Sequence, residues 1–146
     1  MSAEEYLCTR IRRTEQALMA HHEAVLRTYR LTMTQYAVLL TLSRGGDLSG
    51  AQLARACGVT QQSMATVLTG MQNKGLIDRQ PSPVHAKVMI AALTDDGQRV
   101  LEGAYQKVNV LEKAFLDKFT PAEHKQFTDL LDRATETLIE QTPKTG

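Results

Sequence analysis

The chain has few aromatic residues: its 146 positions include three phenylalanines, four tyrosines and no tryptophan. Aliphatic side chains must therefore supply most of the packing, which suits helices packed on helices better than an aromatic-rich β-fold. The hydrophobic and charged fractions, 42% and 23%, lie near the average for globular proteins. We therefore expect a folded, mainly α chain of about one domain rather than a disordered one.

Long apolar runs are also missing, and none approaches the roughly 18 residues that a membrane-spanning helix needs. The N-terminal residues 1–5 lack the basic start and apolar run of a secretory signal. We expect a cytoplasmic protein with no membrane partner. Its two cysteines, Cys8 and Cys57, form no CxxC pair, so no metal site is predicted, and a structural disulfide would be unusual in the reducing cytosol.

Catalytic motifs are absent as well. The sequence contains no nucleophile elbow, phosphate-binding loop or metal-ligand spacing. The acidic pairs at 4–5 and 95–96 are explained as charges at helix starts, where the helix dipole favours them. We predict a protein that is not an enzyme and that needs no cofactor.

The net charge of +1 is small for a protein that binds nucleic acid, but it is unevenly distributed. Residues 1–30 have a net charge of +1 and residues 94–146 a net charge of −3. Residues 44–93 carry five cations and two anions, a net charge of +3. This modest asymmetry places positive charge in the middle of the chain. The five cations are Arg44, Arg55, Lys74, Arg79 and Lys87.

The same middle segment predicts two short helices joined by a tight turn. Ser49 would cap a helix that ends at Gly58, and Thr60 would cap the next, which Gly75 closes in a left-handed conformation. Apolar and small residues are spaced as in two helices that cross steeply, although an ordinary helical hairpin in a core would share this pattern. Those residues are Leu53, Ala54, Val59, Met64 and Val67.

A β-hairpin is predicted directly after these helices. Branched residues at 76–80 and 88–93 indicate two strands, and the prolines in Pro81-Ser82-Pro83 mark the loop between them. Two crossing helices followed by a hairpin form a winged helix-turn-helix, which points to duplex DNA as the partner.

Long amphipathic helices are predicted on both sides of this unit. Apolar residues recur at helical spacing from Leu7 to Tyr29, and again along a fifth helix that begins after Thr94. Thr34 would cap a second helix, and Thr120-Pro121-Ala122-Glu123 is a capping box that begins a sixth. The broad apolar faces of the flanking helices need a partner, and a second copy of the chain is the simplest one.

The outward face of the fourth helix carries short polar side chains that suit a DNA groove. Gln can bond adenine through two hydrogen bonds, and Ser or Thr can reach bases or phosphates. A solvated surface helix is the alternative interpretation. The predicted base-facing residues are Gln61, Gln62, Ser63, Thr66 and Thr69. The predicted phosphate contacts are Ser49, Thr60, Arg55, Lys74, Arg79 and Lys87.

Four segments, taken together, resemble the MarR family of bacterial transcription regulators. They are Leu31-Thr-x-x-Gln35-Tyr36, Leu53-Ala54-x-x-Cys57-Gly58-Val59-Thr60, Lys74-Gly75-Leu76-Ile77-x-Arg79 and Leu93-Thr94-x-x-Gly97. The resemblance implies a triangular homodimer in which the first and last helices interlock and each protomer reads half of a palindrome. The resemblance implies a dimerisation helix at 1–30, a DNA-binding region at 31–97, here called the reading head, and dimerisation helices at 98–146. It also implies a repressor more often than an activator.

The resemblance also implies roles for single residues. Gln62, Ser63 and Thr66 match positions that face bases, although many members have an arginine where Thr66 stands. Lys87 matches the wing-tip cation. The tip itself, His85-Ala86-Lys87, differs from the usual Asp-x-Arg. His85 either adds a charge at lower pH or is an ordinary surface histidine.

Regulation by a ligand is implied in the same way, because relatives often release DNA when a small aromatic acid binds. The candidate polar liners of such a cleft are His21, His22, Arg10 and Tyr36, with interface or core roles as the alternative. Cys8 stands where peroxide-sensing relatives keep a reactive thiol, and a packing role is its alternative. A winged helix that docks proteins instead of DNA remains the competing function.

Overall fold

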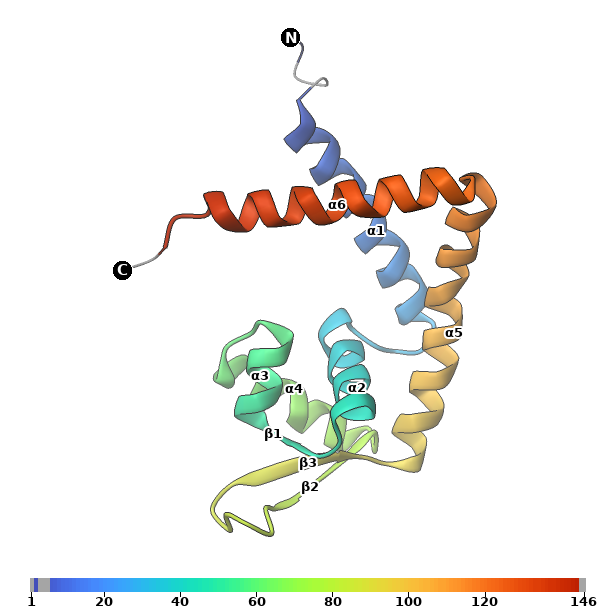
Figure 1. The fold of residues 1–146 in the computed structure, drawn as a ribbon. Helices are drawn as coiled ribbons and strands as arrows, with labels where there is room; N and C mark the ends of the chain where they lie inside the picture. Colours follow the sequence, from blue (N-terminus) through green and yellow to red (C-terminus); the bar gives the residue numbers. More distant parts are fainter. Residues whose placement is uncertain (1, 3–5, 145–146) are drawn as a thin grey trace. The chain divides into compact units, whose positions relative to one another are not determined.

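The structure is a computed structural model, and it describes residues 2 and 6–144. In this part of the chain six helices and three short strands follow one another, as Figure 1 shows. The prediction of a mainly α winged helix-turn-helix is confirmed. The elements are α1 (Leu7–Arg27), α2 (Met33–Gly45), β1 (Leu48–Ser49), α3 (Gly50–Cys57), α4 (Gln61–Asn73), β2 (Ile77–Pro81), β3 (Met89–Leu93), α5 (Asp95–Lys118) and α6 (Pro121–Gln141).

The chain forms two compact units, residues 1–108 and 109–146, and the division falls inside α5. The first unit therefore contains α1, the helix-turn-helix, the sheet and the beginning of α5. The three-part division into 1–30, 31–97 and 98–146 concerns function rather than compactness, and it stays a prediction.

The sheet is antiparallel with the order β1-β3-β2. The two predicted strands form the wing, with Ile77 opposite Leu93 and Pro81 opposite Met89. The third strand, β1, was not predicted: Leu48 and Ser49 pair with Ala91 and Ile90 of β3. This pairing joins the residue that caps α3 directly to the wing.

Hydroxyl caps begin most of the helices, as the sequence predicts. The side chains of Ser49, Thr60 and Thr120 each accept a hydrogen bond from the backbone N–H three residues ahead, at 3.1–3.2 Å. The prediction of Thr34 as the cap of α2 is wrong, because Thr32 holds that place. Thr32 and Gln35 close a reciprocal capping box, in which the Gln35 side chain accepts from the Thr32 N–H at 3.0 Å.

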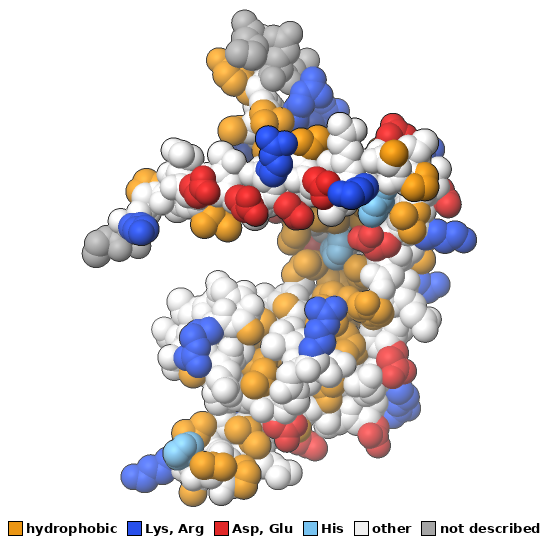
Figure 2. Space-filling model, in the orientation of Figure 1, with side chains coloured by type: hydrophobic (Ala, Val, Ile, Leu, Met, Phe, Trp, Pro, Cys, Tyr) orange, Lys and Arg blue, Asp and Glu red, His pale blue; other side chains and the backbone are white. Residues whose placement is uncertain are grey.

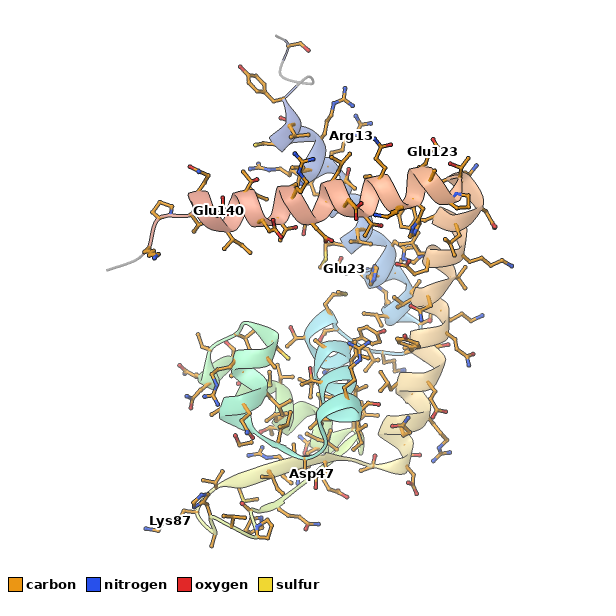
Figure 3. The ribbon with its side chains drawn as sticks, viewed as in Figure 1. Arg13, Glu23, Asp47, Lys87, Glu123 and Glu140 are labelled. Atoms are coloured by element: carbon orange, nitrogen blue, oxygen red, sulfur yellow. The ribbon has the colours of Figure 1, made fainter. Side chains whose placement is uncertain are left out.

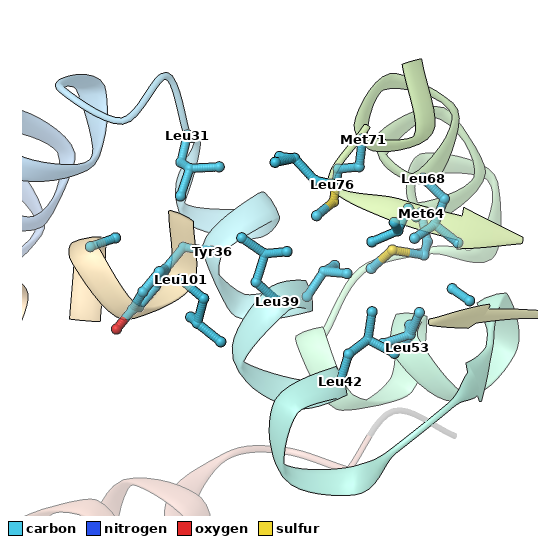
Figure 4. Close-up of a cluster of buried hydrophobic side chains, with 14 of the residues drawn as sticks. Leu31, Tyr36, Leu39, Leu42, Leu53, Met64, Leu68, Met71, Leu76 and Leu101 are labelled. Carbon is cyan, nitrogen blue, oxygen red and sulfur yellow. The ribbon is translucent and has the colours of Figure 1, made fainter. Parts of the chain in front are cut away.

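The core of the first unit lies where α2, α3, α4, the sheet and the beginning of α5 meet. Figure 4 shows the labelled side chains of these elements converging on one interior. The first helix contributes Leu26, which is fully buried. The fully buried large side chains are Leu26, Val38, Leu39, Leu53, Met64, Met71 and Ile77.

The second unit buries much less. Phe119 packs between Phe115 and Phe127, with ring centroids 6.2 and 5.6 Å away, and no residue of α6 is buried. Apolar side chains of α6 remain about half exposed in the single chain: Phe127, Leu130, Leu131 and Leu138. None of the described helices is long and apolar enough to span a lipid bilayer.

Candidate DNA-binding surface

The turn between α3 and α4 sets the direction of α4, which we call the reading helix because its outward face carries the predicted base-facing residues. Gly58 ends α3 with φ of 67°, a left-handed conformation that glycine adopts without a side-chain penalty. Val59 N–H donates to the Ala54 carbonyl at 3.1 Å, and Thr60 then caps α4. Three residues, 58–60, are thus enough to redirect the chain from one helix into the next, as in a helix-turn-helix.

Burial of one face of α4 leaves the predicted reading face in solvent. Met64 and Met71 are fully buried and Leu68 nearly so. The remaining side chains of the first turns point outward, and the structure leaves all of the following exposed: Gln61, Gln62, Ser63, Thr66 and Thr69.

The hydrogen bonds of this face separate its residues into two groups. Thr66 and Thr69 donate to the carbonyls of Gln62 and Ala65, one turn back in the helix, at 3.4 and 3.0 Å. Among the described residues, Gln61 and Gln62 have no side-chain hydrogen bond that would compete with a base edge. Ser63 accepts the Thr60 hydroxyl proton at 3.0 Å and so keeps its own proton for donation.

The wing is an ordered hairpin rather than a loose loop. The Ser82 hydroxyl accepts from the N–H groups of Val84 and His85, both at 3.2 Å, and Ser82 N–H donates to the Val88 carbonyl at 2.7 Å. Figure 3 shows Lys87 at the loop end of the hairpin, pointing away from the sheet. In Figure 2 the wing carries hydrophobic side chains with a cation and a histidine at its end.

A hollow of about 280 Å³ connects the reading helix to the base of the wing. Gln61 of α4, Arg79 of β2 and Ser49 at the start of α3 all line it. The structure therefore brings these three predicted residues together on one surface. The hollow has an apolar floor that sequence reasoning missed, because its residues come from separate elements: Ala51, Leu68, Met89 and Ala91.

Lys74 stands apart from this surface. It follows the last turn of α4, so it lies about 20 Å along the helix from Gln61. Its ammonium donates to the Arg30 carbonyl at 2.7 Å and to Gln35 Oε1 at 3.4 Å. Lys74 thus bonds the connection between α1 and α2. It does not lie near the other predicted phosphate contacts.

The predicted ligand residues are not gathered either. Arg10 and His21 are eleven positions apart on α1, about 16 Å along its axis. The rings of His21 and His22 meet edge to face at 5.5 Å, and the His22 ring bonds the Leu18 carbonyl. Tyr36 is buried on α2, where burial raises the pKa of its phenol, Tyr105 raises it further and Arg44 opposes both.

A second hollow, of about 240 Å³, lies between α2 and the first part of α5. Arg44 and Tyr105, which both act on the pKa of Tyr36, are among its lining residues. A cation and a phenol beside Leu40 and Leu101 suit an aromatic acid, whereas the Glu102 carboxylate on the same lining opposes an anion. Sequence reasoning missed this hollow because α5 begins some fifty positions after Arg44.

The two cysteines differ in exposure. Cys8 is exposed near the start of α1, whereas Cys57 is half-buried at the end of α3 and packs against the core. Burial raises the pKa of the Cys57 thiol, and a hydrogen bond with the Thr41 hydroxyl opposes that shift in part. Cys57 is therefore the less reactive thiol of the two.

Comparison with known proteins decides the family. A sequence model of the MarR family matches residues 31–87. The HTH-type transcriptional repressor Rv2887 of Mycobacterium tuberculosis is 30% identical over 110 residues, which cover 75% of this chain and 79% of that protein. The chain belongs to the MarR family. Its members are regulators of transcription rather than enzymes, and this chain is a DNA-binding regulator of that type.

Solved MarR-type structures agree with the fold. PcaV of Streptomyces coelicolor aligns with a TM-score of 0.76 and 25% identity, covering 92% of this chain and 98% of PcaV. BpsR of Bordetella bronchiseptica aligns with a TM-score of 0.77 and 21% identity over 92% and 96% of the two chains. The DNA binding of BpsR is regulated by 6-hydroxynicotinic acid, and PcaV has been solved with its natural ligand.

Proposed function

We propose that this MarR-family regulator binds a palindromic operator as a homodimer and represses transcription. The observation that carries the proposal is the surface shared by α4 and the wing. There Gln61, Ser49 and Arg79 line one hollow, and the polar side chains on the outward face of α4 are exposed. In the dimer, two α4 helices would enter successive major grooves about one helical turn apart. Gln61, Gln62, Ser63 and Thr66 would face bases, and Thr69 would lie at the edge of the groove.

The phosphate contacts of this proposal surround the reading helix. Ser49 and Thr60 stand at helix N-termini, where backbone N–H groups and the helix dipole favour an anion. Arg79 and Lys87 add positive charge from the wing, and His85 adds more when protonated. The reading helix itself has no cation before Lys74, so we expect DNA shape and deformability to contribute much of the specificity.

Apolar side chains support the homodimer. In the single chain, α6 leaves Phe127, Leu130, Leu131 and Leu138 about half exposed on one face. A second copy would remove this apolar surface from water. Each protomer would then present one reading helix to one half of the palindrome.

We further propose that a small aromatic acid releases the DNA. The support is the hollow between α2 and α5, with Arg44 and Tyr105 beside Tyr36, together with the ligand-regulated relatives. The histidines His21 and His22, with Arg10, would contribute if a partner protomer completes the cleft.

The experiment starts from DNA selection. The protein is incubated with a randomised duplex pool, and the selected duplex is compared with poly(dI–dC) by mobility shift over increasing salt. A palindromic selected sequence and an affinity that falls steeply with salt are expected. Affinity without sequence preference or salt dependence would instead favour the protein-docking winged helix. Adding salicylate to the bound complex then tests release.

A further inference from the structure

The end of the reading helix is tied to a distant corner of the chain. Lys74 follows the last turn of α4, and its side chain reaches the connection between α1 and α2. There its ammonium donates to the Arg30 carbonyl at 2.7 Å. The two residues are 44 positions apart, so the bond joins two segments that the chain itself does not connect closely.

The residue that accepts this bond has an unusual backbone. Arg30 has a φ of 55°, and among the described residues no other residue besides glycine has a positive φ. The left-handed conformation is unfavourable for a residue with a Cβ atom. Such a residue keeps this conformation only where surrounding contacts stabilise it. The local hydrogen bonds that close α1 hold this conformation: Arg30 N–H bonds the Arg27 carbonyl and Leu31 N–H bonds the Leu26 carbonyl, both at 3.0 Å. The Lys74 ammonium then caps the Arg30 carbonyl from outside the turn.

The same ammonium also reaches the start of α2. Gln35 Oε1 lies 3.4 Å from Lys74 Nζ while it accepts the Thr32 N–H at 3.0 Å. One oxygen therefore serves the capping box of α2 and the lysine of α4. With two of its three N–H donors directed at this corner, the ammonium fixes the end of α1 and the beginning of α2 against the end of α4.

The opposite side of the same turn is also held. The Gly75 carbonyl accepts the Thr94 hydroxyl at 2.6 Å, at the start of α5. The segment that follows α4 is thus bonded to Thr94, directly before α5, and to the α1–α2 corner. Only the bond to the α1–α2 corner depends on a flexible charged side chain, that of Lys74, which could instead bind a phosphate.

We propose that Lys74 is a positioning residue of the DNA-reading surface, which couples α4 to the α1–α2 corner and makes no phosphate contact. The proposal rests on the proposed DNA-reading function. Lys74 would affect sequence-specific binding through the orientation of α4, because its bond to Arg30 joins the end of α4 to the turn that follows α1. A change in the end of α1 would then reach α4 through Lys74.

The first test separates positioning from phosphate contact by salt dependence. Lys74→Met keeps the aliphatic stem and removes the ammonium. We expect about a five-fold loss of affinity for the selected duplex, with an unchanged salt slope and an unchanged affinity for poly(dI–dC). Lys74→Arg, whose guanidinium can donate to the same carbonyl, should restore most of the loss. A slope that falls by about 0.9 for each lost contact, on both DNAs, would overturn the proposal.

The second test uses the free protein and needs no DNA. Hydrogen exchange of residues 28–36 should become faster in Lys74→Met and return toward the parent rate in Lys74→Arg. Lys87→Met is the matched control, because it removes a cation from the wing and should leave exchange at this corner unchanged. Unchanged exchange in Lys74→Met would refute the coupling.

The two tests also keep the two proposals apart. If the parent protein binds no duplex with salt-dependent affinity, the proposed function fails while the exchange experiment still decides the coupling. Lys74→Gln, whose side chain is too short to reach the carbonyl, replaces Lys74→Met in both measurements if methionine prevents folding.

Discussion

Single residues decide how closely the elements of the first unit approach. At Gly97, near the start of α5, a Cβ atom would lie 2.0 Å from the Leu76 carbonyl oxygen, which is a backbone atom and has little freedom to move. The helix start is fixed there by the Thr94 hydroxyl, which accepts the Gly97 N–H at 3.0 Å. A glycine is therefore required by contact, without any special backbone angle.

The first prediction concerns this contact. Gly97→Ala should destabilise the fold by about 3 kcal/mol, because the start of α5 must move away from Leu76, and the melting temperature should fall by roughly 10 °C. Circular dichroism at one fixed protein concentration measures it. Gly70→Ala is the control: it lies inside α4 with open space around the new methyl group, and it should raise stability by about 0.5–1 kcal/mol. Equal melting temperatures for Gly97→Ala and the parent would contradict the packing.

The two thiols provide a second prediction at this scale. Iodoacetamide at about pH 8 should modify the exposed Cys8 well before Cys57, because burial raises the pKa of the Cys57 thiol and keeps it protonated. Mass spectrometry of digested protein at successive times gives both rates. Cys8→Ser should remove the fast phase and leave the slow one. Peroxide treatment of the parent then tests the thiol-sensor alternative, which fails if DNA affinity does not change.

At the scale of elements, local signals could be predicted from the sequence and distant pairings could not. Ser49, Thr60 and Gly58 act within four residues of their own position, and the structure confirms all three. The cap of α2 was misplaced because two threonines compete there, and only Thr32 has a glutamine three residues later to complete the box. Strand β1 has two residues, and its partner lies more than forty positions away, so no periodicity marks it.

The candidate site follows the same rule. The exposed face of α4 could be predicted from the spacing of its buried residues, Met64, Leu68 and Met71. The bond from Lys74 to Arg30 could not, because a lysine at a helix end is equally compatible with a phosphate, a carbonyl or solvent. Only the fold shows which group stands within its reach.

The wing provides the prediction that belongs to elements. Lys87→Ala should weaken binding to every duplex and reduce the salt slope by about 0.9 per protomer, because a phosphate contact is lost regardless of sequence. Gln62→Ala should instead leave the slope unchanged and reduce the preference for the selected duplex over single-base variants. Lys113→Ala, on α5, controls for the change of net charge. Undiminished binding of Lys87→Ala at every sequence would show that the wing tip does not touch DNA.

At the scale of the whole molecule, charge and apolar surface are separated along the chain. The reading head carries the net positive charge, and the segment after it is acidic. The apolar surface that the single chain leaves exposed is concentrated on the flanking helices, including α6, which buries no residue of its own. Under the proposed function, DNA contact would fall to the middle region and self-association to the flanking helices.

The last prediction tests that assignment. Leu131→Glu places a charge on the apolar face of α6, where Leu131 is 47% exposed in the single chain. Burying an unpaired carboxylate between two copies is costly, so the variant should be monomeric by sedimentation at concentrations where the parent is a dimer, and its affinity for the selected duplex should fall more than ten-fold. Lys125→Gln changes the charge of the same helix by the same amount on its opposite side, where Lys125 is exposed, and it should remain dimeric and bind as the parent does. If Leu131→Glu stays dimeric, this face of α6 is not the dimer interface, and the exposed apolar residues of α1 become the next surface to test.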